Sequence, residues 1–257
     1  RTRRGSSPDI RPGTALAPSR AGWGDGGERS VGERTKAGYG RLFWNRCTSA
    51  FGHQHWWPAK TAFETMVGAI LAQNVSWTNA ARAVASLERA GMLDPGRLAA
   101  ADTGDIARLI VPSRFYNQKA ERIREFAGVY VTEFQADPAV MAATGTEALR
   151  ERLLSLPGLG KETVDTILLY ACEKPVFVVD AYTRRVFTRY GLLPEKASYD
   201  RTQRLFADNL NPDAELFNDY HAQIVHLGKT VCRKSPLCDR CPIRVVHRSL
   251  RCAGAPE

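Results

Sequence analysis

The stretch Leu156–Gly160, with the sequence LPGLG, constrains the fold more than any other feature because helical patterns lie on both sides of it. Apolar residues repeat at helical spacing around it: Leu149, Leu153 and Leu156 before the turn, and Val164, Ile167, Leu168 and Ala171 after it. Pro157 lacks an N–H group and ends the first helix. Gly158 and Gly160 can adopt positive φ and let another backbone come close. The stretch therefore predicts two helices joined by a tight hairpin.

The second of these helices is expected to begin near Lys161. Its first N–H groups and the positive end of its dipole then face outward, which suits a phosphate group, and Lys161 adds a charge. An ordinary helical corner closed by a glycine is the alternative interpretation. The formal net charge of +9 favours a polyanionic partner, since lysine and arginine neutralise phosphates and release counterions.

The rest of the chain from Tyr39 onward also has a helical pattern interrupted by short loops. FETMVGAILAQ places Phe63, Met66, Val67, Ile70 and Leu71 on one face of a helix. Thr144 and Glu147 are spaced as a capping box ahead of the hairpin. There is no sustained alternation of period two, and Val176–Val179 is too short to imply a sheet. The predicted class is all-α.

The N-terminal residues 1–36 are rich in Gly, Ser, Pro and Arg and have no apolar periodicity, so they are predicted to be a disordered basic arm. No apolar run approaches the ~20 residues that span a bilayer, and Arg3-Arg4 precede no apolar signal segment. The cysteines are unevenly spread, unlike those of an exported disulfide protein. We therefore expect a cytoplasmic, nucleoid-associated protein with no membrane partner.

LPGLGKETVDTILLYA followed by VVDAYTRRVF resembles the helix–hairpin–helix plus Gly/Pro…Asp signature of the endonuclease III superfamily of DNA glycosylases. The resemblance runs from about Tyr39 to Cys252 and includes FETMVGAILAQN, FYNQKAERI and the C-terminal cysteines. WWPAKTAFETMVGAILAQN, FYNQKA and GKE most resemble the 3-methyladenine DNA glycosylases of endonuclease III type. The resemblance implies two helical lobes with a DNA cleft between them.

The family chain leaves one lobe and returns to it, which fixes the expected boundaries. Residues 57–174 are expected to form a helical-barrel lobe that carries the hairpin. Residues 37–56 and 175–257 are expected to form the second lobe, with an iron–sulfur cluster loop at its C-terminus. Asp180 then lies in the cleft, just after the chain crosses between the lobes.

Asp180 matches the family's catalytic aspartate, which stabilises positive charge on the sugar while the base leaves and helps to activate water. The chemistry is reasonable by itself, because a fixed carboxylate stabilises an oxocarbenium-like centre. A helix N-cap is the other interpretation of Asp180, and both roles can hold together. Bifunctional members carry a nucleophilic lysine two residues after the second hairpin glycine, where this chain has Glu162. Glu162 either orients water or the target base, or only favours the helix dipole.

The resemblance also places aromatic and wedge residues around a flipped base. Trp56, Trp57 and Trp77 are expected to line the base pocket, where stacking on a cationic alkylated purine adds a cation–π contribution. Core packing is the alternative for each of these rings. Gln73 matches the position that fills the space left by the flipped base, and Phe115 in FYNQKA matches a second wedge position. Simple core packing is again the alternative for Phe115.

The last part of the chain contains VCRKSPLCDRCPIRVVHRSLRC, in which thiols repeat as Cys232-x5-Cys238-x2-Cys241-x10-Cys252. Four thiolates in a short loop are typical of an iron–sulfur or zinc site, and the resemblance favours a 4Fe-4S cluster over zinc. The usual family spacing is C-x6-C-x2-C-x5-C, so the first gap is one residue shorter and His247 stands in the fourth position. Cys252 is the favoured fourth ligand and His247 the alternative. Cys47 and Cys172 are expected to be buried and apolar in character.

These observations predict a monomeric base-excision-repair enzyme that binds double-stranded DNA containing a damaged base. The leading hypothesis is a monofunctional glycosylase that hydrolyses the N-glycosidic bond of alkylated bases such as 3-methyladenine. One rival is a bifunctional oxidised-pyrimidine glycosylase with AP lyase activity, against which the absent lysine argues. The other is a catalytically weak DNA-binding paralogue, which the altered cysteine spacing favours.

Overall fold

The structure, a computed structural model, describes residues 31–54, 56–57 and 59–244. In these residues all regular secondary structure is helical, so the predicted all-α class is confirmed. The helices are α1 (Val31–Phe51), α2 (Ala62–Leu71), α3 (Trp77–Arg89), α4 (Pro95–Ala100), α5 (Thr103–Leu109), α6 (Tyr116–Phe134), α7 (Pro138–Ala143), α8 (Thr146–Leu154), α9 (Lys161–Cys172), α10 (Ala181–Arg189), α11 (Tyr199–Ala207) and α12 (Ala214–Thr230), with 3₁₀ turns η2 (Val111–Ser113) and η3 (Cys238–Arg240).

Local sequence explains where many of these helices begin. A short polar side chain accepts a hydrogen bond from a backbone N–H group in the first turn of eight helices, which satisfies donors that have no partner inside the helix. These N-cap residues are Thr61, Ser76, Asp94, Asp102, Asp137, Asp180, Ser198 and Asp213. Among the helices of the described residues, none has the length and apolar character of a membrane span.

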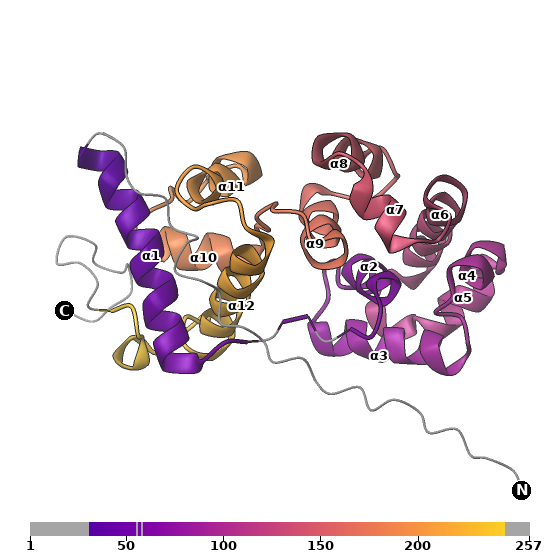
Figure 1. Ribbon diagram of the computed structural model, residues 1–257. Helices are drawn as coiled ribbons and strands as arrows, with labels where there is room; N and C mark the ends of the chain where they lie inside the picture. The colour runs from indigo at the N-terminus through magenta and orange to yellow at the C-terminus, as the bar shows by residue number, and fades with distance from the viewer. Residues whose placement is uncertain (1–30, 55, 58, 245–257) are drawn as a thin grey trace, which may run out of the picture.

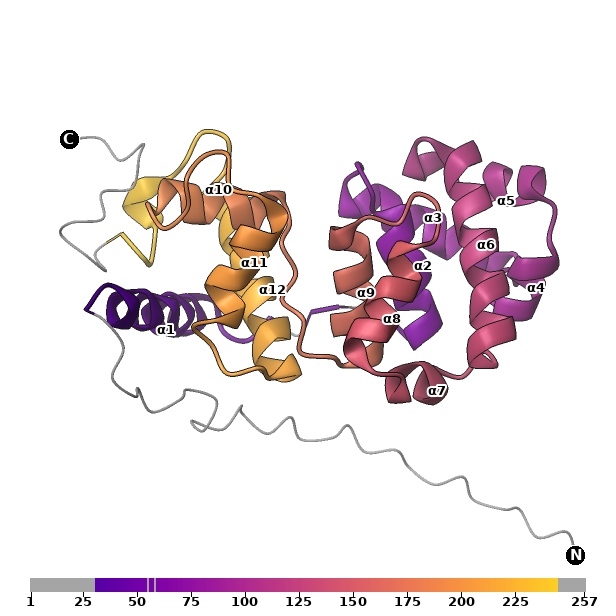
Figure 2. The ribbon, with the colours of Figure 1, turned by 90° about the horizontal axis from the view of Figure 1, so that it is seen from above.

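The helices form two groups, each around its own apolar core (Figures 1 and 2). The first core is built by α2 to α9, and the second by α1, α10, α11 and α12. Helix α9 contacts α12, so these two helices lie where the groups meet. The chain crosses between the groups twice, after α1 and after α9. We propose that these groups are the two domains, with boundaries at 57–174 and at 37–56 with 175–257.

The structure corrects two local predictions. Helix α1 begins at Val31, so residues 31–36 of the predicted arm are helical, while residues 1–30 lie outside the described residues. The predicted capping box of Thr144 and Glu147 is wrong. Gly145 is the N-cap of α8 and makes no side-chain cap, because Thr144 closes α7 instead and its hydroxyl donates to the Val140 carbonyl at 3.3 Å.

The hairpin between α8 and α9 has the predicted form, with different roles for its glycines. Gly158 has φ of +77°, and an added Cβ would lie 2.1 Å from Nε of Arg122, so glycine is required there. Gly160 has φ of −89° as the N-cap of α9, so the expected positive φ is confirmed for Gly158 and wrong for Gly160. A Cβ at Gly160 would meet nothing within 4 Å, so the start of α9 is open on that side.

Candidate active site

Asp180 follows the buried segment 177–179 and begins helix α10, so it stands where the chain has just crossed between the two groups. One carboxylate oxygen, Oδ1, accepts hydrogen bonds from the backbone N–H of Thr183 at 2.7 Å and from its hydroxyl at 2.8 Å. The side chain is 14% exposed. The capping interaction that the sequence offered as an alternative is therefore present, and it fixes the orientation of the carboxylate.

The other oxygen of Asp180, Oδ2, faces a histidine that sequence reasoning missed. Nε2 of His221, from α12, lies 3.6 Å from Oδ2, and Nδ1 of the same ring lies 2.6 Å from the hydroxyl of Tyr170. Burial acts to raise the pKa of Asp180, but the facing imidazole and the hydrogen bonds from Thr183 hold it below its ordinary value. Asp180 is therefore ionised at neutral pH.

Glu162 lies in the first turn of α9 and shares its surroundings with Asp180. Desolvation raises the pKa of Glu162 first, and the negative charge of Asp180 raises it further, against the opposing influence of the His221 ring and Arg184. Two carboxyl groups whose environments move their pKa values in opposite directions are a common arrangement in sites of acid–base chemistry.

Three tryptophans form a connected aromatic cluster. The ring centroid of Trp77 lies 4.6 Å from that of Trp57 and 5.9 Å from that of Trp56, and all three residues are half-buried. Trp57 also packs on Tyr170 at 5.4 Å, which joins the cluster to the Tyr170–His221–Asp180 chain. A cation already stacks on one ring, since Nζ of Lys229 lies 4.7 Å from the ring centroid of Trp56.

The two predicted wedge residues are held in different ways. Gln73 is tied to the hairpin: its Nε2 donates to the Gly158 carbonyl at 3.0 Å and to the Thr163 hydroxyl at 2.9 Å, and Arg122 donates to its Oε1 at 2.8 Å. Phe115 is 61% exposed and has left-handed backbone geometry with φ of 43°. Phe115 is therefore not a core residue, and its ring is displayed at the surface before α6.

A buried lysine, also missed by sequence reasoning, supports both wedge positions. Nζ of Lys119 donates to the carbonyls of Leu71 and Gln73 at 2.8 Å and to that of Ser113 at 2.5 Å. These acceptors belong to the end of α2 and to the turn that leads to Phe115. Desolvation, together with the charge of nearby Arg122, lowers the pKa of Lys119 to about 8. With three carbonyls around it, this amine serves as a structural donor.

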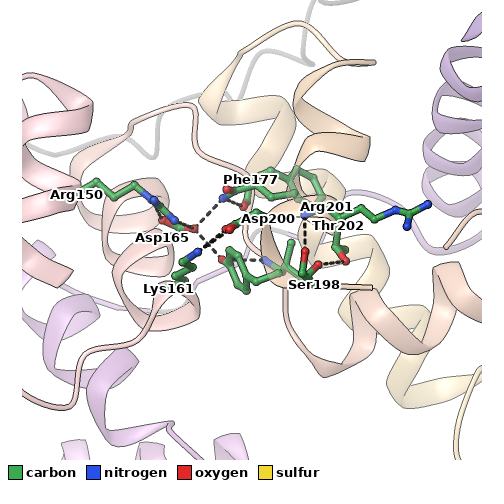
Figure 3. Close-up of polar contacts among 11 residues, drawn as sticks. Arg150, Lys161, Asp165, Phe177, Ser198, Asp200, Arg201 and Thr202 are labelled. Carbon is green, nitrogen blue, oxygen red and sulfur yellow. Dashed lines mark hydrogen bonds and ion pairs between the residues drawn. The ribbon is translucent and has the colours of Figure 1, made fainter. Parts of the chain in front are cut away.

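Polar contacts also join α8 and α9 to α11 across the meeting of the two groups (Figure 3). Asp165 is fully buried and receives two hydrogen bonds from Arg150 at 2.6 and 3.1 Å. Its Oδ2 also accepts from the Tyr199 hydroxyl at 2.8 Å and from Gln203 at 2.7 Å. At the surface, Nζ of Lys161 pairs with Asp200 at 2.6 Å. The expected phosphate-binding lysine therefore has an ionic partner in the protein without DNA.

The cysteine loop follows α12 and is described only as far as residue 244. Cys232 is 8% exposed, Cys238 and Cys241 are half-buried, and Nη1 of Arg189 lies 3.6 Å from Sγ of Cys232. In the described part of the chain, no group of three or more His, Cys, Asp or Glu side chains could hold a metal ion. Cys252 and His247 lie outside the described residues. Cys47 and Cys172 are buried as expected.

Comparisons with known proteins identify the family of the chain. Residues 67–212 match the model of the HhH-GPD superfamily base excision DNA repair proteins. A protein of Methanocaldococcus jannaschii that carries the name of a DNA repair glycosylase is 45% identical over 76% of this chain and 89% of its own length.

Two solved structures show the same fold. The 3-methyladenine DNA glycosylase of H. pylori, bound to 1,N6-ethenoadenine, has a TM-score of 0.62 and 28% identity, covering 76% of this chain and 97% of its own. An endonuclease III trapped in a covalent DNA intermediate has a TM-score of 0.70 and 18% identity, covering 82% of this chain and 95% of its own. On the family match and the M. jannaschii relative together, the chain belongs to the HhH-GPD superfamily of base excision DNA repair proteins and is a DNA glycosylase.

Proposed function

We propose that this glycosylase removes alkylated bases such as 3-methyladenine from double-stranded DNA, and that it is monofunctional and leaves an abasic site. The observation that carries the proposal is that the ionised Asp180 is linked to the tryptophan cluster through His221 and Tyr170, while the hairpin slot for a nucleophilic amine holds Glu162. The likeness to the H. pylori 3-methyladenine enzyme supports the choice of substrate.

Asp180 supplies the electrostatic part of the reaction. As the N-glycosidic bond breaks, positive charge develops on the sugar, and a carboxylate already fixed by Thr183 stabilises that charge without reorganising. Its second oxygen, Oδ2, is directed toward His221 rather than into the cap and so is the oxygen available to the sugar and to an attacking water. Glu162, with its raised pKa, is the second group that can hold a proton or orient a water.

The tryptophan cluster gives the pocket its selectivity. An N-alkylated purine carries a positive charge, so stacking on Trp56, Trp57 or Trp77 adds a cation–π contribution of about 0.5–2 kcal/mol. The Lys229 ammonium over Trp56 supports a cation-accepting site, since the ring binds a positive group in the protein without DNA. Such a base is also a good leaving group and needs less catalytic help than an ordinary base.

Binding to the duplex uses the hairpin and the two wedge residues. The open start of α9 beside Gly160 and the charge of Lys161 receive a phosphate, and Gly158 permits the tight turn that places them. The exposed ring of Phe115 enters the base stack, where it offsets part of the unstacking cost. Gln73, held by the hairpin carbonyl of Gly158, fills the space that the flipped base leaves.

Water, and no lysine, completes the reaction in this proposal. Glu162 cannot form a Schiff base with the sugar, and the neighbouring Lys161 pairs with Asp200 at the surface. Lys119 has a lowered pKa but is buried and bonded to three carbonyls. Neither of these two amines is therefore placed as a nucleophile, and with Glu162 in the hairpin slot strand cleavage is not expected.

We also propose that Cys232, Cys238, Cys241 and Cys252 hold a 4Fe-4S cluster. Family membership and the soft sulfur donors on one short loop support this. Such a cluster would shape a basic loop against DNA. Iron and sulfide content of wild type, Cys252→Ala and His247→Ala tests the ligand set: loss of iron in Cys252→Ala alone is expected. Loss in His247→Ala alone, or zinc in the purified wild type, would contradict the assignment.

A substrate panel tests the proposed function. Duplexes that carry 3-methyladenine, uracil, thymine glycol or an abasic site are incubated with the protein, and base release is resolved from strand nicking. We expect base release from the alkylated duplex and no nicking of any duplex. Release from thymine glycol accompanied by nicking would show the bifunctional activity instead.

A further inference from the structure

His221 is a buried histidine to which the proposed reaction gives no role, and it lies between Tyr170 and Asp180. The residue is 5% exposed and lies on α12, with one ring nitrogen toward Tyr170 of α9 and the other toward Asp180 at the start of α10. Nδ1 is 2.6 Å from the Tyr170 hydroxyl. Nε2 is 3.6 Å from Oδ2 of Asp180 and has no hydrogen-bond partner in the described part of the chain. A buried polar atom without a partner is costly, so its position calls for a cause.

The hydroxyl of Tyr170 decides which ring nitrogen carries the proton. Burial raises the pKa of Tyr170 well above its ordinary value, and the charges of Asp180 and Asp219 raise it further, so the phenol keeps its proton. Its one hydrogen bond among the described residues is to Nδ1 of His221. A phenol that donates to Nδ1 requires that nitrogen to be unprotonated, which leaves the imidazole proton on Nε2.

The opposite tautomer is electrostatically disfavoured in this site. A proton on Nδ1 would point at the phenol, and the lone pair of Nε2 would face the carboxylate of Asp180. With the proton on Nε2, an N–H donor faces Oδ2 of Asp180, and the lone pair of Nδ1 faces the hydroxyl of Tyr170. Each contact then pairs a donor with an acceptor. The 3.6 Å separation is longer than a hydrogen bond. Contacts of this kind often shorten when the substrate closes the site.

We propose that Tyr170 and His221 are positioning residues, in which the phenol fixes the Nε2–H tautomer of the imidazole and the imidazole directs a neutral donor at Oδ2 of Asp180. The pair keeps the carboxylate ionised and aimed while the base leaves, and no proton is transferred. The role of Asp180 in this inference rests on the proposed function. The assignment of the Nε2–H tautomer does not rest on the proposed function, so an experiment can contradict either one without the other.

Other charged groups face the same space and affect the acidity of Asp180. Glu162 of α9, Arg184 of α10 and Lys229 of α12 all act on this site electrostatically, and Asp219 of α12 acts on Tyr170. Variants at Tyr170 and His221 leave these four groups in place. The charged groups around Asp180 are therefore the same in every variant, so a change in the pH profile comes from the substituted residue.

The tautomer is measured first, without DNA and without catalysis. The full chain has five histidines, so ¹⁵N-histidine labelling gives few ring signals, and the signal absent from His221→Gln identifies His221. We expect the ring proton of His221 to lie on Nε2 in the wild type, and a mixture of tautomers in Tyr170→Phe. A ring protonated at Nδ1 in the wild type, or an unchanged signal in Tyr170→Phe, would overturn the proposal.

The pH dependence of single-turnover base release tests the effect on Asp180. His221→Gln keeps an amide nitrogen near the position of Nε2, whereas His221→Asn places its amide near Nδ1 and leaves Oδ2 without a donor. Loss of the donor raises the pKa of Asp180. In His221→Asn the acidic limb of the pH–rate profile is therefore expected to move to higher pH by about one unit. His221→Gln is expected to keep the wild-type limb.

His226→Gln is the matched control, because His226 lies on the same helix and packs on Phe51 at 4.6 Å. Its profile is expected to equal that of the wild type. If His221→Gln and His221→Asn were slowed equally with no shift of the limb, the histidine would be only structural and the proposal would fail. If Asp180→Asn kept full base release while the Nε2–H tautomer was observed, the proposed function would fail and the tautomer assignment would stand.

Discussion

The two oxygens of Asp180 have different surroundings, and this difference separates its structural role from its chemical one. Oδ1 is held by the N–H and hydroxyl of Thr183, as in an ordinary helix cap. Oδ2 faces His221 across 3.6 Å. A substitution that keeps the cap and removes the charge therefore tests the chemistry without disturbing the helix.

Asp180→Asn is that substitution. Asparagine caps helices about as well as aspartate, so the thermal midpoint is expected to change little. Base release from the alkylated duplex is expected to fall by about 10²–10³-fold, the usual loss when one preorganised electrostatic group is removed from an active site. Single-turnover kinetics and a thermal melt measure the two effects.

Asp213→Asn is the matched control for Asp180→Asn, since Asp213 caps α12 through the N–H of Leu216 at 2.7 Å in the same way. It should leave base release unchanged. Equal losses of activity in the two variants would mean that Asp180 acts only through the helix it begins.

At the level of single residues, the sequence predicts the site residues that belong to motifs but not the residues that hold them in place. Asp180, Glu162 and the tryptophans stand in a recognisable order along the chain, and the structure brings Asp180 near the tryptophan cluster through Tyr170 and His221. His221 and Lys119 each occur singly within helical patterns whose buried faces are apolar. Only tertiary contacts reveal what each of them binds, so no local signal identifies them.

At the scale of elements, Lys119 joins the end of α2 to the turn before α6. Its amine binds the carbonyls of Leu71, Gln73 and Ser113, which otherwise have few partners at a helix end and a tight turn. The exposed ring of Phe115 follows this turn in left-handed geometry. The position of the Phe115 ring therefore depends on the hydrogen bonds of the buried Lys119.

Lys119→Met is expected to lower the free energy of unfolding by about 3 kcal/mol, because three buried carbonyls lose a donor. The pKa of Lys119 is lowered to about 8 in the folded protein from 10.5. Between these pH values the unfolded chain binds a proton that the folded one does not, so stability due to Lys119 rises with pH through this window. Urea unfolding of wild type and variant across this range measures the difference, which should grow toward alkaline pH.

Lys60→Met provides the control, since Lys60 is an exposed lysine that pairs with Glu88 at the surface. Its stability should follow that of the wild type at every pH. A pH-independent difference between wild type and Lys119→Met would contradict the lowered pKa.

Helices were easier to predict than their ends. The apolar stripes of α2, α8 and α9 and the proline of the hairpin identify these helices from sequence, and their burial follows from the same stripes. The predicted N-cap of α8 is wrong because Thr144 is the C-cap of the short helix α7. The φ of Gly160 depends on its place as the N-cap of α9, which glycine composition does not reveal.

At the scale of the whole molecule, Asp165 joins the two groups of helices. It is fully buried on α9 and binds Arg150 of α8 together with Tyr199 and Gln203 of α11 (Figure 3). Asp165→Asn is expected to lower the free energy of unfolding by about 3–5 kcal/mol, because it leaves the Arg150 charge without its partner. Chemical denaturation measures this loss, and a change below about 1 kcal/mol would show that the contact is not needed to join the groups.

The exposed Lys161–Asp200 pair predicts how the molecule binds DNA. Lys161→Met should weaken binding to undamaged duplex. It should also reduce the magnitude of the slope of log K, the association constant, against log salt concentration by about one, as expected for one lost phosphate contact. Asp200→Asn should strengthen binding, because the ionic partner of Lys161 is removed. Fluorescence anisotropy over a salt series measures both variants. A Lys161→Met slope equal to that of the wild type would exclude a phosphate contact there.

The architecture of two helical groups and its double crossing are implied by the family resemblance, not by periodicity, which identifies helices without placing them. Contacts between the groups, such as those of Asp165 with Tyr199 and Gln203, join residues that are far apart in sequence.

The central claim is that water, and no amine of the protein, takes the place of the leaving base. Borohydride trapping during turnover of a 3-methyladenine duplex tests it most directly, with an endonuclease III and its thymine glycol substrate as the positive control. We expect base release with no covalent protein–DNA adduct and no strand nicking. A trapped adduct that forms at the rate of base release would contradict it.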